Sequence, residues 1–544
     1  MAEKFDIIIV GGGHNGLACG AYLAKAGQKV IVFERRDLVG GGVMTEEITL
    51  PGFKHNTHSA MHEWIFMGPV YYDLELKKYG ALYKFAPGLA NVFEDGSSIV
   101  LYRDLDRTVK QIEKFSKKDA VTYREIVTEF LNYSDLVVTS YLFNAPMSAS
   151  QWASRLEGTH AGREFLRMMA SSSYYIIDEL FENEKVKAWL MINVTQSSIP
   201  QDSFGSGLIF PSMHPALHKC GIGTAVGGSI SLAKAMGKVI EANGGVVKNN
   251  SEVKEIMVKN GVAQGIRLSD GTEYLANKAV ACNVGPTLIF GEGKMIGKEH
   301  LDETFLKQIS HWRPGEVALF TFHMALNEQI RYKAADKEPD VDRCYTVGMV
   351  ETVEVLQKQF NAIRIGEIPR GDAIGFLAVH PTVVDSTQAP AGKHTAFIWQ
   401  FAVNTKIIKG GPEKWDEVKE EYQEECLRFW AKYTKNLDKE GVILAKHSDS
   451  PLDIARKNPS MIYGDLSGGS MDQDQITIFR PFHGYPPYHT PIENLFMCGP
   501  STHSGGGCSA APGYNAANAI AEALKIKKWW KTPAYFGGAP EEEM

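Results

Sequence analysis

Three glycines near the beginning of the chain, Gly11, Gly13 and Gly16, have a spacing that suits phosphate binding. They follow a β-branched run at Phe5–Val10 and open a helical pattern at Asn15–Ala26. In such a strand–turn–helix unit the glycines permit a tight turn, a close approach of the backbone to a pyrophosphate, and close packing of helix on strand. The N-terminus of the helix supplies free N–H groups for the phosphates. The pattern therefore predicts a dinucleotide-binding site.

An acidic residue stands where the ribose of a dinucleotide would be recognised. The second predicted strand, Lys29–Phe33, leads directly to Glu34, which lies 18 residues after Gly16. A carboxylate at this place accepts hydrogen bonds from the ribose hydroxyls and repels a 2′-phosphate, which argues against NADP. These residues alone leave FAD and NAD open.

Two further glycine-rich segments favour FAD, because they predict additional close approaches of the backbone to a cofactor. One follows the acidic residue directly. The other lies near the end of the chain, where a short strand ends in glycine and a helix opens with Pro-Gly-Tyr-Asn. The residues concerned are Gly40, Gly41, Gly42, Gly499, Pro512 and Gly513.

Four motifs carry a resemblance to a known family, and they lie at both ends and in the middle of the chain: VGGGHNGLACGAYLAKAGQKVIVFERR, GGGVMTEE, GGVVKNNSEVKEI and CGPSTHSGGGCSAAPGYNAANAI. The chain resembles the phytoene desaturase-like (CrtI-type) FAD oxidoreductases, a branch of the amine-oxidase-like flavoproteins. Leu50–Pro69 looks more like the carotenoid ketolases. The resemblance implies an α/β fold, in which a discontinuous, Rossmann-like FAD-binding domain is interleaved with a mixed α+β substrate domain.

The resemblance also implies roles for single residues. Gly11, Gly13 and Gly16 would bind the FAD pyrophosphate, and Glu34 would bind the adenosine ribose with Arg35 beside it. Gly40 and Gly41 match the double glycine of the family, whereas Gly42 stands where many members have an arginine. The backbone of Val253 would contact the adenine, and Gly499 with the Pro512–Gly513 turn would contact the flavin side.

The expected FAD-binding domain comprises residues 1–107, 218–290 and 480–530, with a helix at 224–243 and a small β-meander after it. The expected substrate domain comprises residues 108–217 and 291–479, and residues 531–544 form a C-terminal tail. Residues 317–325 and 395–403 read as buried strands over the pocket. The first part of the substrate domain is helical and rich in large apolar side chains, which suit both a helix core and a long apolar cavity: Tyr141, Phe143, Met147, Trp152, Met168, Met169, Tyr174, Tyr175, Phe181, Trp189 and Met191.

Desaturation removes a hydride and a proton from neighbouring carbons, and the proton needs an acceptor. His62 and Glu63, which follow the double glycine in the chain, are the predicted catalytic residues, together with the nearby His58. The alternative is that these histidines hold a loop by hydrogen bonds. Three further residues are considered. His214 is another candidate base, His503 is expected beside the flavin without a proton-transfer role, and Arg480 could satisfy a flavin carbonyl or a loop carboxylate.

The composition excludes several other classes of protein. The 544 residues carry a net charge of −7, so no nucleic-acid partner is expected. Seven cysteines without a CxxC pair argue against a disulfide scaffold or a metal site and suit a reducing compartment, which predicts a cytoplasmic protein. No secretory signal and no apolar run long enough to span a membrane are visible. Lys525–Lys531, with its paired tryptophans, fits either a solvent-facing helix end or contact with a membrane surface.

The leading hypothesis is an FAD-dependent dehydrogenase or desaturase that acts on a hydrophobic, isoprenoid- or carotenoid-like small molecule. A ketolase that oxidises an allylic carbon, an amine oxidase, and a flavin-bearing binding protein with little turnover are the alternatives. The electron acceptor stays open between oxygen, a quinone and another carrier, and the sequence does not indicate an oligomeric state.

Overall fold

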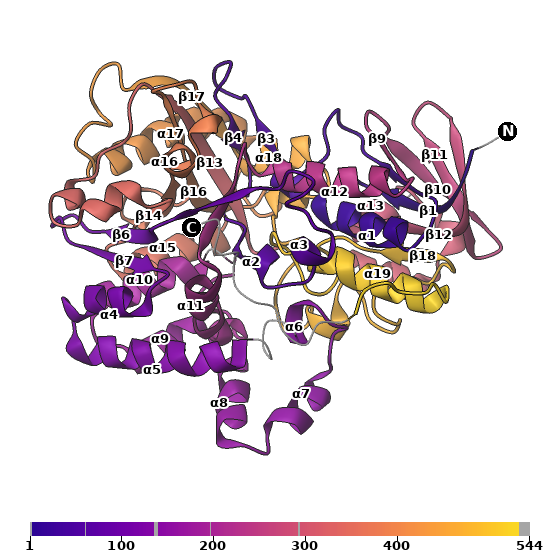
Figure 1. Ribbon diagram of the computed structural model, residues 1–544, viewed down its shortest axis with the longest axis horizontal. Helices are drawn as coiled ribbons and strands as arrows, with labels where there is room; N and C mark the ends of the chain where they lie inside the picture. Colours follow the sequence, from indigo (N-terminus) through magenta and orange to yellow (C-terminus); the bar gives the residue numbers. More distant parts are fainter. Residues whose placement is uncertain are drawn as a thin grey trace.

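The computed structural model describes residues 3–59, 61–134, 140–195, 197, 199–291 and 294–531. Its first sheet brings together segments from both ends and from the middle of the chain (Figure 1). Strands β1, β2 and β9 run parallel, β12 and β18 extend this parallel part, and β10–β11–β12 form an antiparallel meander. The bounds are β1 Glu3–Val10, β2 Val30–Phe33, β9 Val246–Lys248, β10 Val253–Lys259, β11 Val262–Leu268, β12 Glu273–Cys282 and β18 Leu495–Met497.

The apolar run in β1 is buried on both of its faces, which explains why it does not alternate with polar residues. On one face Ile7 and Ile9 pack with the helices α1 (His14–Lys25), α12 (Ile230–Ala242) and α19 (Ala511–Ala523). On the other face Ile8 and Val10 pack with the meander, α13 (Pro286–Phe290) and α14 (Glu303–Ser310). The predicted strand–turn–helix–strand unit is therefore confirmed.

Two predicted helix bounds differ from the structure. The helix expected at 224–243 begins only at Ile230, because Gly227 and Gly228 adopt positive φ angles of 78° and 101° and separate it from a short strand. That strand is β8 (Ile222–Ala225), which pairs with β5 (Tyr83–Ala86). The last helix ends at Ala523 rather than near Lys528, and Lys525 has a positive φ of 54°.

The second sheet has the order β17-β13-β16-β15-β14-β6-β7 and is antiparallel except where β14 meets β6. Its two central strands, β13 and β16, pair over ten residues and confirm the strands predicted at 317–325 and 395–403. The expected division put residues 88–102 with the nucleotide-binding part, but β6 and β7 join this sheet instead. The bounds are β6 Gly88–Val92, β7 Ser98–Tyr102, β13 Val317–Leu326, β14 Thr346–Met349, β15 Phe376–Val379, β16 His394–Val403 and β17 Ile443–Asp449.

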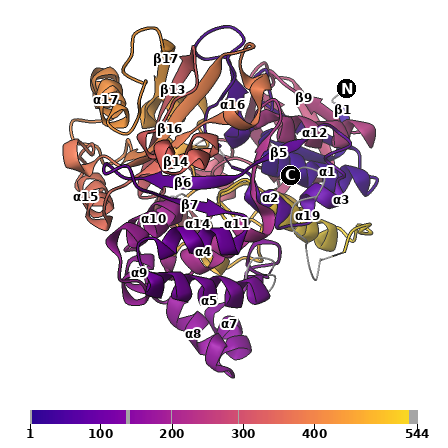
Figure 2. The ribbon, with the colours of Figure 1, turned by 60° about the vertical axis from the view of Figure 1, so that its left-hand side comes forward.

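Helices cover both faces of the second sheet. One face packs against α17 (Lys414–Ala431), through the buried Trp415, Tyr422 and Trp430. The other face packs against a helical layer that includes most of residues 105–220 and α15 (Val353–Arg364). Both ribbon views show α7 and α8 at the lower end of this layer, below α5 (Figure 2). Its helices are α4 Leu105–Glu113, α5 Lys117–Ser134, α6 Ser140–Leu142, α7 Ala149–Leu156, α8 His160–Met169, α9 Ser173–Leu180, α10 Glu184–Thr195 and α11 Ile209–Cys220.

Several short elements lie between the strands of the two sheets or follow them in the chain. The strands β3 (Thr45–Glu46) and β4 (His55–Asn56) form a small ribbon after the double glycine. The helices α2 (Glu63–Phe66) and α3 (Val70–Asp73) follow it, α16 (Pro381–Val384) lies between β15 and β16, and α18 (Pro451–Lys457) follows β17.

Candidate functional site

A cavity of about 740 Å³ lies between the two sheets and the helical layer. At one end its wall contains the glycine loop, the residues that follow β2, and residues 251–254 at the start of β10. At the other end the wall is formed by apolar side chains of the helical layer and of the second sheet. One continuous space therefore joins the predicted dinucleotide site to an apolar chamber.

The glycine loop has the geometry that the sequence predicts. Gly11 adopts a positive φ of 99°, and a Cβ atom on Gly16 would lie 2.4 Å from the carbonyl oxygen of Gly11. Gly13 forms a bridge with Gly40, and a Cβ atom on Gly41 would lie 3.0 Å from the Cα atom of Gly13. The two glycine turns can contact each other only because they lack side chains.

The N-terminus of α1 opens into the cavity. Gly13 caps this helix without a side-chain hydrogen bond, so the first-turn N–H groups keep their capacity to bind an anion. His14 and Asn15 line the cavity, and the buried Oδ1 atom of Asn15 has no hydrogen-bond partner within the described residues. The free N–H groups of the helix N-terminus fit a pyrophosphate, whereas the Asn15 oxygen is an acceptor and fits a donor group.

Glu34 is fixed at the end of β2 by two backbone N–H groups. Gly12 donates to its Oε2 and Arg36 donates to its Oε1, each at 2.9 Å. Glu34, Arg35 and Val253 all line the cavity, as expected for the residues predicted to surround an adenosine. This end of the cavity therefore fits a dinucleotide with an unphosphorylated ribose.

Several of the predicted cofactor residues lie behind the wall and not in it. A Cβ atom on Gly513 would lie 2.0 Å from the carbonyl oxygen of Asn15, so this glycine allows α19 to approach the start of α1. Gly499 packs against Asn283 in the same way, and Pro512 is buried in the first turn of α19. These three residues position the loop, whereas Pro500 and residues 506–509 line the cavity.

Of the two predicted catalytic residues, Glu63 lines the cavity and His62 does not. Glu63 lines the cavity and is only 4% exposed. Burial raises the pKa of its carboxyl group from 4.5 to about 7, and its Oε2 atom has no hydrogen-bond partner in the described chain. A carboxyl group with a pKa near neutrality can take up or release a proton during a reaction.

His62 does not line the cavity. Its Nε2 lies 2.7 Å from Ser59 Oγ and its Nδ1 lies 2.8 Å from the hydroxyl of Tyr83. Burial, together with the charge of His14, lowers the pKa of His62 to about 3, so the ring is neutral. The geometry fits the alternative that the sequence left open, in which this histidine holds a loop.

The other candidates also differ in position. His58 lines the cavity, and burial lowers its pKa to about 4. His503 lies behind the wall and donates from Nε2 to the carbonyl oxygen of Tyr141 at 2.6 Å. His214 is buried in the helical layer, 3.0 Å from the hydroxyl of Tyr123. None of the predicted histidines other than His58 lines the cavity.

Arg480 links two loops next to the cavity by hydrogen bonds. Its fully buried guanidinium donates to the carbonyl oxygens of Ser467, Ser470 and Pro500 at 2.6–2.9 Å. Burial lowers the pKa of this group to about 10, against the effect of the nearby Asp465 carboxylate, which raises it. Arg480 therefore joins two loops that line the cavity. Its hydrogen bonds go to loop carbonyl oxygens, and none of those found within the described residues goes to a carboxylate.

The apolar chamber contains only part of the predicted aromatic and methionine set. Tyr141, Met147, Trp152 and Met169 line it, whereas Phe143, Phe181, Trp189 and Met191 are buried in the core and Tyr175 is 59% exposed. Several lining residues were not predicted from the sequence: Phe165, Ile199, Leu208, Ile209, Met213, Leu377, Val379 and Trp399. The spacing of four between Phe165 and Met169, and between Ile209 and Met213, is a signal that could have found two pairs of them.

The paired tryptophans of Lys525–Lys531 pack against the protein. Trp529 stacks on Tyr22 of α1 with ring centroids 5.4 Å apart, and its Nε1 donates to the Tyr22 carbonyl oxygen. Trp530 is 5% exposed and donates to Asn518 of α19. Across the described residues, no helix has the length and the apolar character needed to cross a membrane.

The comparisons with known proteins agree with this architecture. Residues 9–66 match the family described as NAD(P)-binding Rossmann-like domain. One of the limonene dehydrogenase subunits of Castellaniella defragrans is 29% identical, over 98% of this chain and 97% of that protein. Pyridine nucleotide-disulfide oxidoreductase domain-containing protein 2 of Rattus norvegicus is 28% identical, over 96% of this chain and 94% of its own. Phytoene desaturase of Cercospora nicotianae is 25% identical, over 73% of this chain and 61% of its own.

Two solved structures show the same fold. An oxidoreductase from Methanosarcina mazei has a TM-score of 0.58 at 17% identity, and covers 95% of this chain and 100% of that one. A putrescine oxidase variant has a TM-score of 0.58 at 14% identity, and covers 96% of this chain and 99% of its own. The amine-oxidase-like α/β fold, with its second mixed sheet, is confirmed. The likeness of Leu50–Pro69 to carotenoid ketolases finds no support among these relatives.

Proposed function

We propose that this chain, a Rossmann-like oxidoreductase related to the phytoene desaturases and to limonene dehydrogenase, uses FAD to remove hydride from a compact, hydrophobic, isoprenoid-like substrate. The observation that carries this proposal is the single cavity that begins at the glycine loop and ends in an apolar chamber. A dinucleotide bound at the first end would extend toward a substrate held at the second.

The residues at the first end would hold FAD. The N-terminus of α1 with Gly13 would bind the pyrophosphate, Glu34 the adenosine ribose, and residues 251–254 the adenine. When bound, FAD supplies an acceptor for hydride. The Rossmann-like architecture supports a dinucleotide, and the resemblance that runs through both ends of the chain favours FAD over NAD.

Glu63 is the residue that we assign to the proton. Hydride removal from one carbon leaves a proton to be lost from its neighbour in a desaturation, and Glu63 is a buried carboxyl group in the wall with a pKa of about 7. Met61 and Trp64 line the same cavity, and Glu63 is only 4% exposed. Glu63 must be ionised to accept a proton, so turnover is expected to rise as the pH rises through about 7.

The size of the cavity favours a compact substrate. Its volume of about 740 Å³ lies within the range of roughly 300–1,000 Å³ that is usual for a single small-molecule or cofactor site. The same cavity must hold both the dinucleotide and the substrate, which supports a short isoprenoid over an extended carotenoid. The similarity to the limonene dehydrogenase protein over 98% of the chain supports the same choice. The electron acceptor stays open between oxygen, a quinone and another carrier. Contact with a membrane surface stays a prediction.

The proposal is tested by anaerobic mixing of the FAD-loaded protein with a panel of isoprenoids of increasing length. The expected result is bleaching of the flavin absorbance by a short, apolar member, and a product that has lost two hydrogen atoms by mass spectrometry. Glu63→Gln is expected to slow the bleaching about 100-fold, the lower end of what general acid–base catalysis supplies, without weakening FAD binding. Glu47→Gln, at an exposed carboxylate in the same region, is the matched control.

Two outcomes would contradict the proposed reaction, and a third would contradict the role of Glu63. Unchanged flavin spectra with every member of the panel would favour the flavin-bearing binding protein. A product with added oxygen would favour the ketolase. An unaffected rate in the Glu63→Gln variant would remove Glu63 from the reaction and leave the hydride transfer standing.

A further inference from the structure

The wall of the cavity includes a segment that follows the second sheet. Lys457, the last residue of α18, and the four residues after it, up to Met461, line the same cavity as the glycine loop. The nucleotide-binding motifs do not include this segment, which lies more than 400 residues after the glycine loop and Glu34 in the chain. Arg35 donates from its guanidinium to the carbonyl oxygen of Lys457, so the segment is tied to the residue that follows the ribose-binding Glu34.

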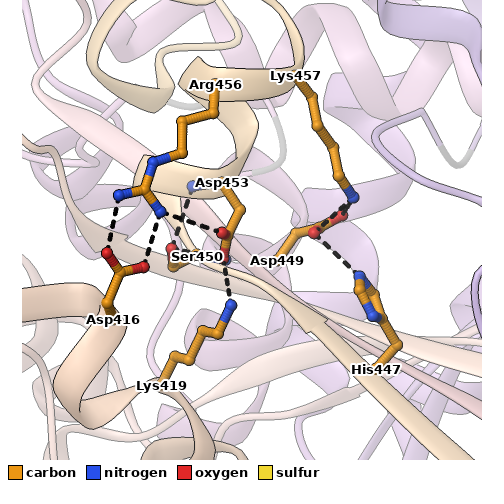
Figure 3. Close-up of polar contacts among 8 residues, drawn as sticks. All are labelled: Asp416, Lys419, His447, Asp449, Ser450, Asp453, Arg456 and Lys457. Carbon is orange, nitrogen blue, oxygen red and sulfur yellow. Dashed lines mark hydrogen bonds and ion pairs between the residues drawn. The ribbon is translucent and has the colours of Figure 1, made fainter. Parts of the chain in front are cut away.

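The ammonium group of Lys457 is held by a buried carboxylate (Figure 3). Its Nζ atom lies 2.7 Å from each carboxylate oxygen of Asp449, and the Asp449 side chain is 1% exposed. The Nε2 atom of His447 lies 3.0 Å from the Oδ1 atom of the same carboxylate. A lysine has three N–H donors, so one donor of Lys457 remains for a group in the cavity. Because the anchor is buried, the position of this cation is fixed before any ligand binds.

The neighbouring α18 residue shows that this arrangement is specific to Lys457. Arg456 turns to the opposite side of the helix, where it pairs with Asp416 at 2.8 Å, and it does not line the cavity (Figure 3). Lys457 also lies near enough to His58 for its charge to affect that ring, and His58 lines the cavity after the double glycine. Lys457 therefore belongs to the same cavity wall as Arg35 of the ribose end and Gly41 and Gly42 of the double-glycine segment.

The double-glycine segment supplies no cation of its own. Gly42 stands where the family resemblance leads to the expectation of an arginine. A Cβ atom on Gly42 would lie 3.3 Å from the Cε atom of Met461, so the segment after α18 occupies the space next to this glycine.

We propose that Lys457, anchored by Asp449 of β17, is a phosphate-binding residue for the dinucleotide, supplied by the end of α18 in place of a cation after the double glycine. This inference rests on the proposed binding of FAD. It gives the second sheet a role in cofactor binding, and it explains why a buried carboxylate holds a lysine that lies in the wall of the cavity.

The test measures the dissociation constant of FAD from the apoprotein by quenching of flavin fluorescence. Lys457→Gln is expected to weaken FAD binding about tenfold or more, because it removes a charge-assisted hydrogen bond to a phosphate. Lys457→Arg, which keeps the charge, is expected to restore most of the affinity. Arg456→Gln removes the same charge from the same helix outside the cavity, and should change the dissociation constant less than twofold.

A further variant separates phosphate binding from a structural role of the ion pair. Asp449→Asn keeps the lysine charge but loosens its anchor, so it is expected to weaken FAD binding less than Lys457→Gln does. If Asp449→Asn weakens FAD binding as much as Lys457→Gln, or if Lys457→Gln binds FAD like the unchanged protein, the inference is overturned while the proposed function stands. If the unchanged protein takes up no FAD, the proposed function itself fails.

Discussion

The two ends of the cavity are built from different kinds of segment. The dinucleotide end is built from residues 11–16, 34–42 and 251–254, and in the first two of these segments glycines and Glu34 lie at short spacings. The apolar end is formed by single side chains from α7, α8, α11, β15 and β16, which are separated by as many as 250 residues. Most of these cavity-lining side chains are apolar, and so are the neighbouring side chains that pack in the core.

This difference reflects what each end must do. A pyrophosphate is bound by backbone N–H groups, so the chain must bring bare backbone close to the ligand, and only glycine permits this. An apolar substrate is bound by surface area, which many side chains can supply with little constraint on type. The first end is therefore sensitive to the addition of one methyl group, whereas the second is expected to respond gradually.

The largest effect is expected at Gly16, in the dinucleotide end. Gly16→Val places a side chain against the carbonyl oxygen of Gly11, which a Cβ atom alone would already approach to 2.4 Å. FAD binding should weaken about 100-fold, near the upper end of the ~1–3 kcal/mol that overpacking costs. The dissociation constant of FAD from the apoprotein measures it.

Gly27→Asn is the matched control at the other end of α1. Gly27 also has a positive φ, of 82°, but no atom lies within 4 Å of a Cβ placed there, and asparagine tolerates this conformation. If both variants bind FAD like the unchanged protein, the close approach at Gly16 does not shape the site.

A smaller effect is expected at Met169, in the apolar end. Met169→Gln exchanges a cavity-lining side chain of α8 for a polar one, and it should raise the KM for the hydrophobic substrate about tenfold, given the roughly 1.5–3 kcal/mol that burial of a methionine contributes. FAD binding should not change. Met168→Gln, at the next position on the same helix and outside the cavity wall, is the control. An equal effect of the two variants would mean that the chamber does not bind the substrate.

The smallest effect concerns the contribution of Glu63, in the wall of the cavity, to the pH dependence of the stability of the protein. The carboxyl group of Glu63 has a pKa of about 7 when folded and about 4.5 when unfolded. Between these values the folded state binds more protons, so the contribution of this group to stability falls as the pH rises from about 4.5 through 7. We therefore expect the difference in Tm between the Glu63→Gln variant and the unchanged protein, both as apoproteins, to grow by a few degrees in favour of the variant as the pH rises across this window. A constant difference in Tm would show that Glu63 is not buried as described.

The sequence predicted the first sheet and the dinucleotide end well, because both depend on local patterns. The glycine loop, Glu34 and the two central strands of the second sheet all lie where the sequence places them. It could not tell that Gly513 and Gly499 serve contacts within the protein, because a glycine needed for helix packing has the same identity as one needed for a ligand. Gly513 contacts the carbonyl of Asn15, almost 500 residues earlier in the chain.

The catalytic pair shows a similar limit. His62 and Glu63 are adjacent in sequence, but the turn into α2 directs one side chain between Ser59 and Tyr83 and places the other in the wall of the cavity. The choice depends on Tyr83 of β5, which no local pattern connects to this segment. Lys457 was missed for the same reason, since its relation to Arg35 exists only in the folded chain.

The central claim is that the dinucleotide site and the apolar chamber form one space. A crystal structure of the FAD-loaded protein tests it most directly. The account predicts the adenosine beside Glu34 and the isoalloxazine ring at the junction between Glu63 and the chamber. A flavin ring directed away from Glu63, or a chamber closed off from the ring by side chains, would contradict it.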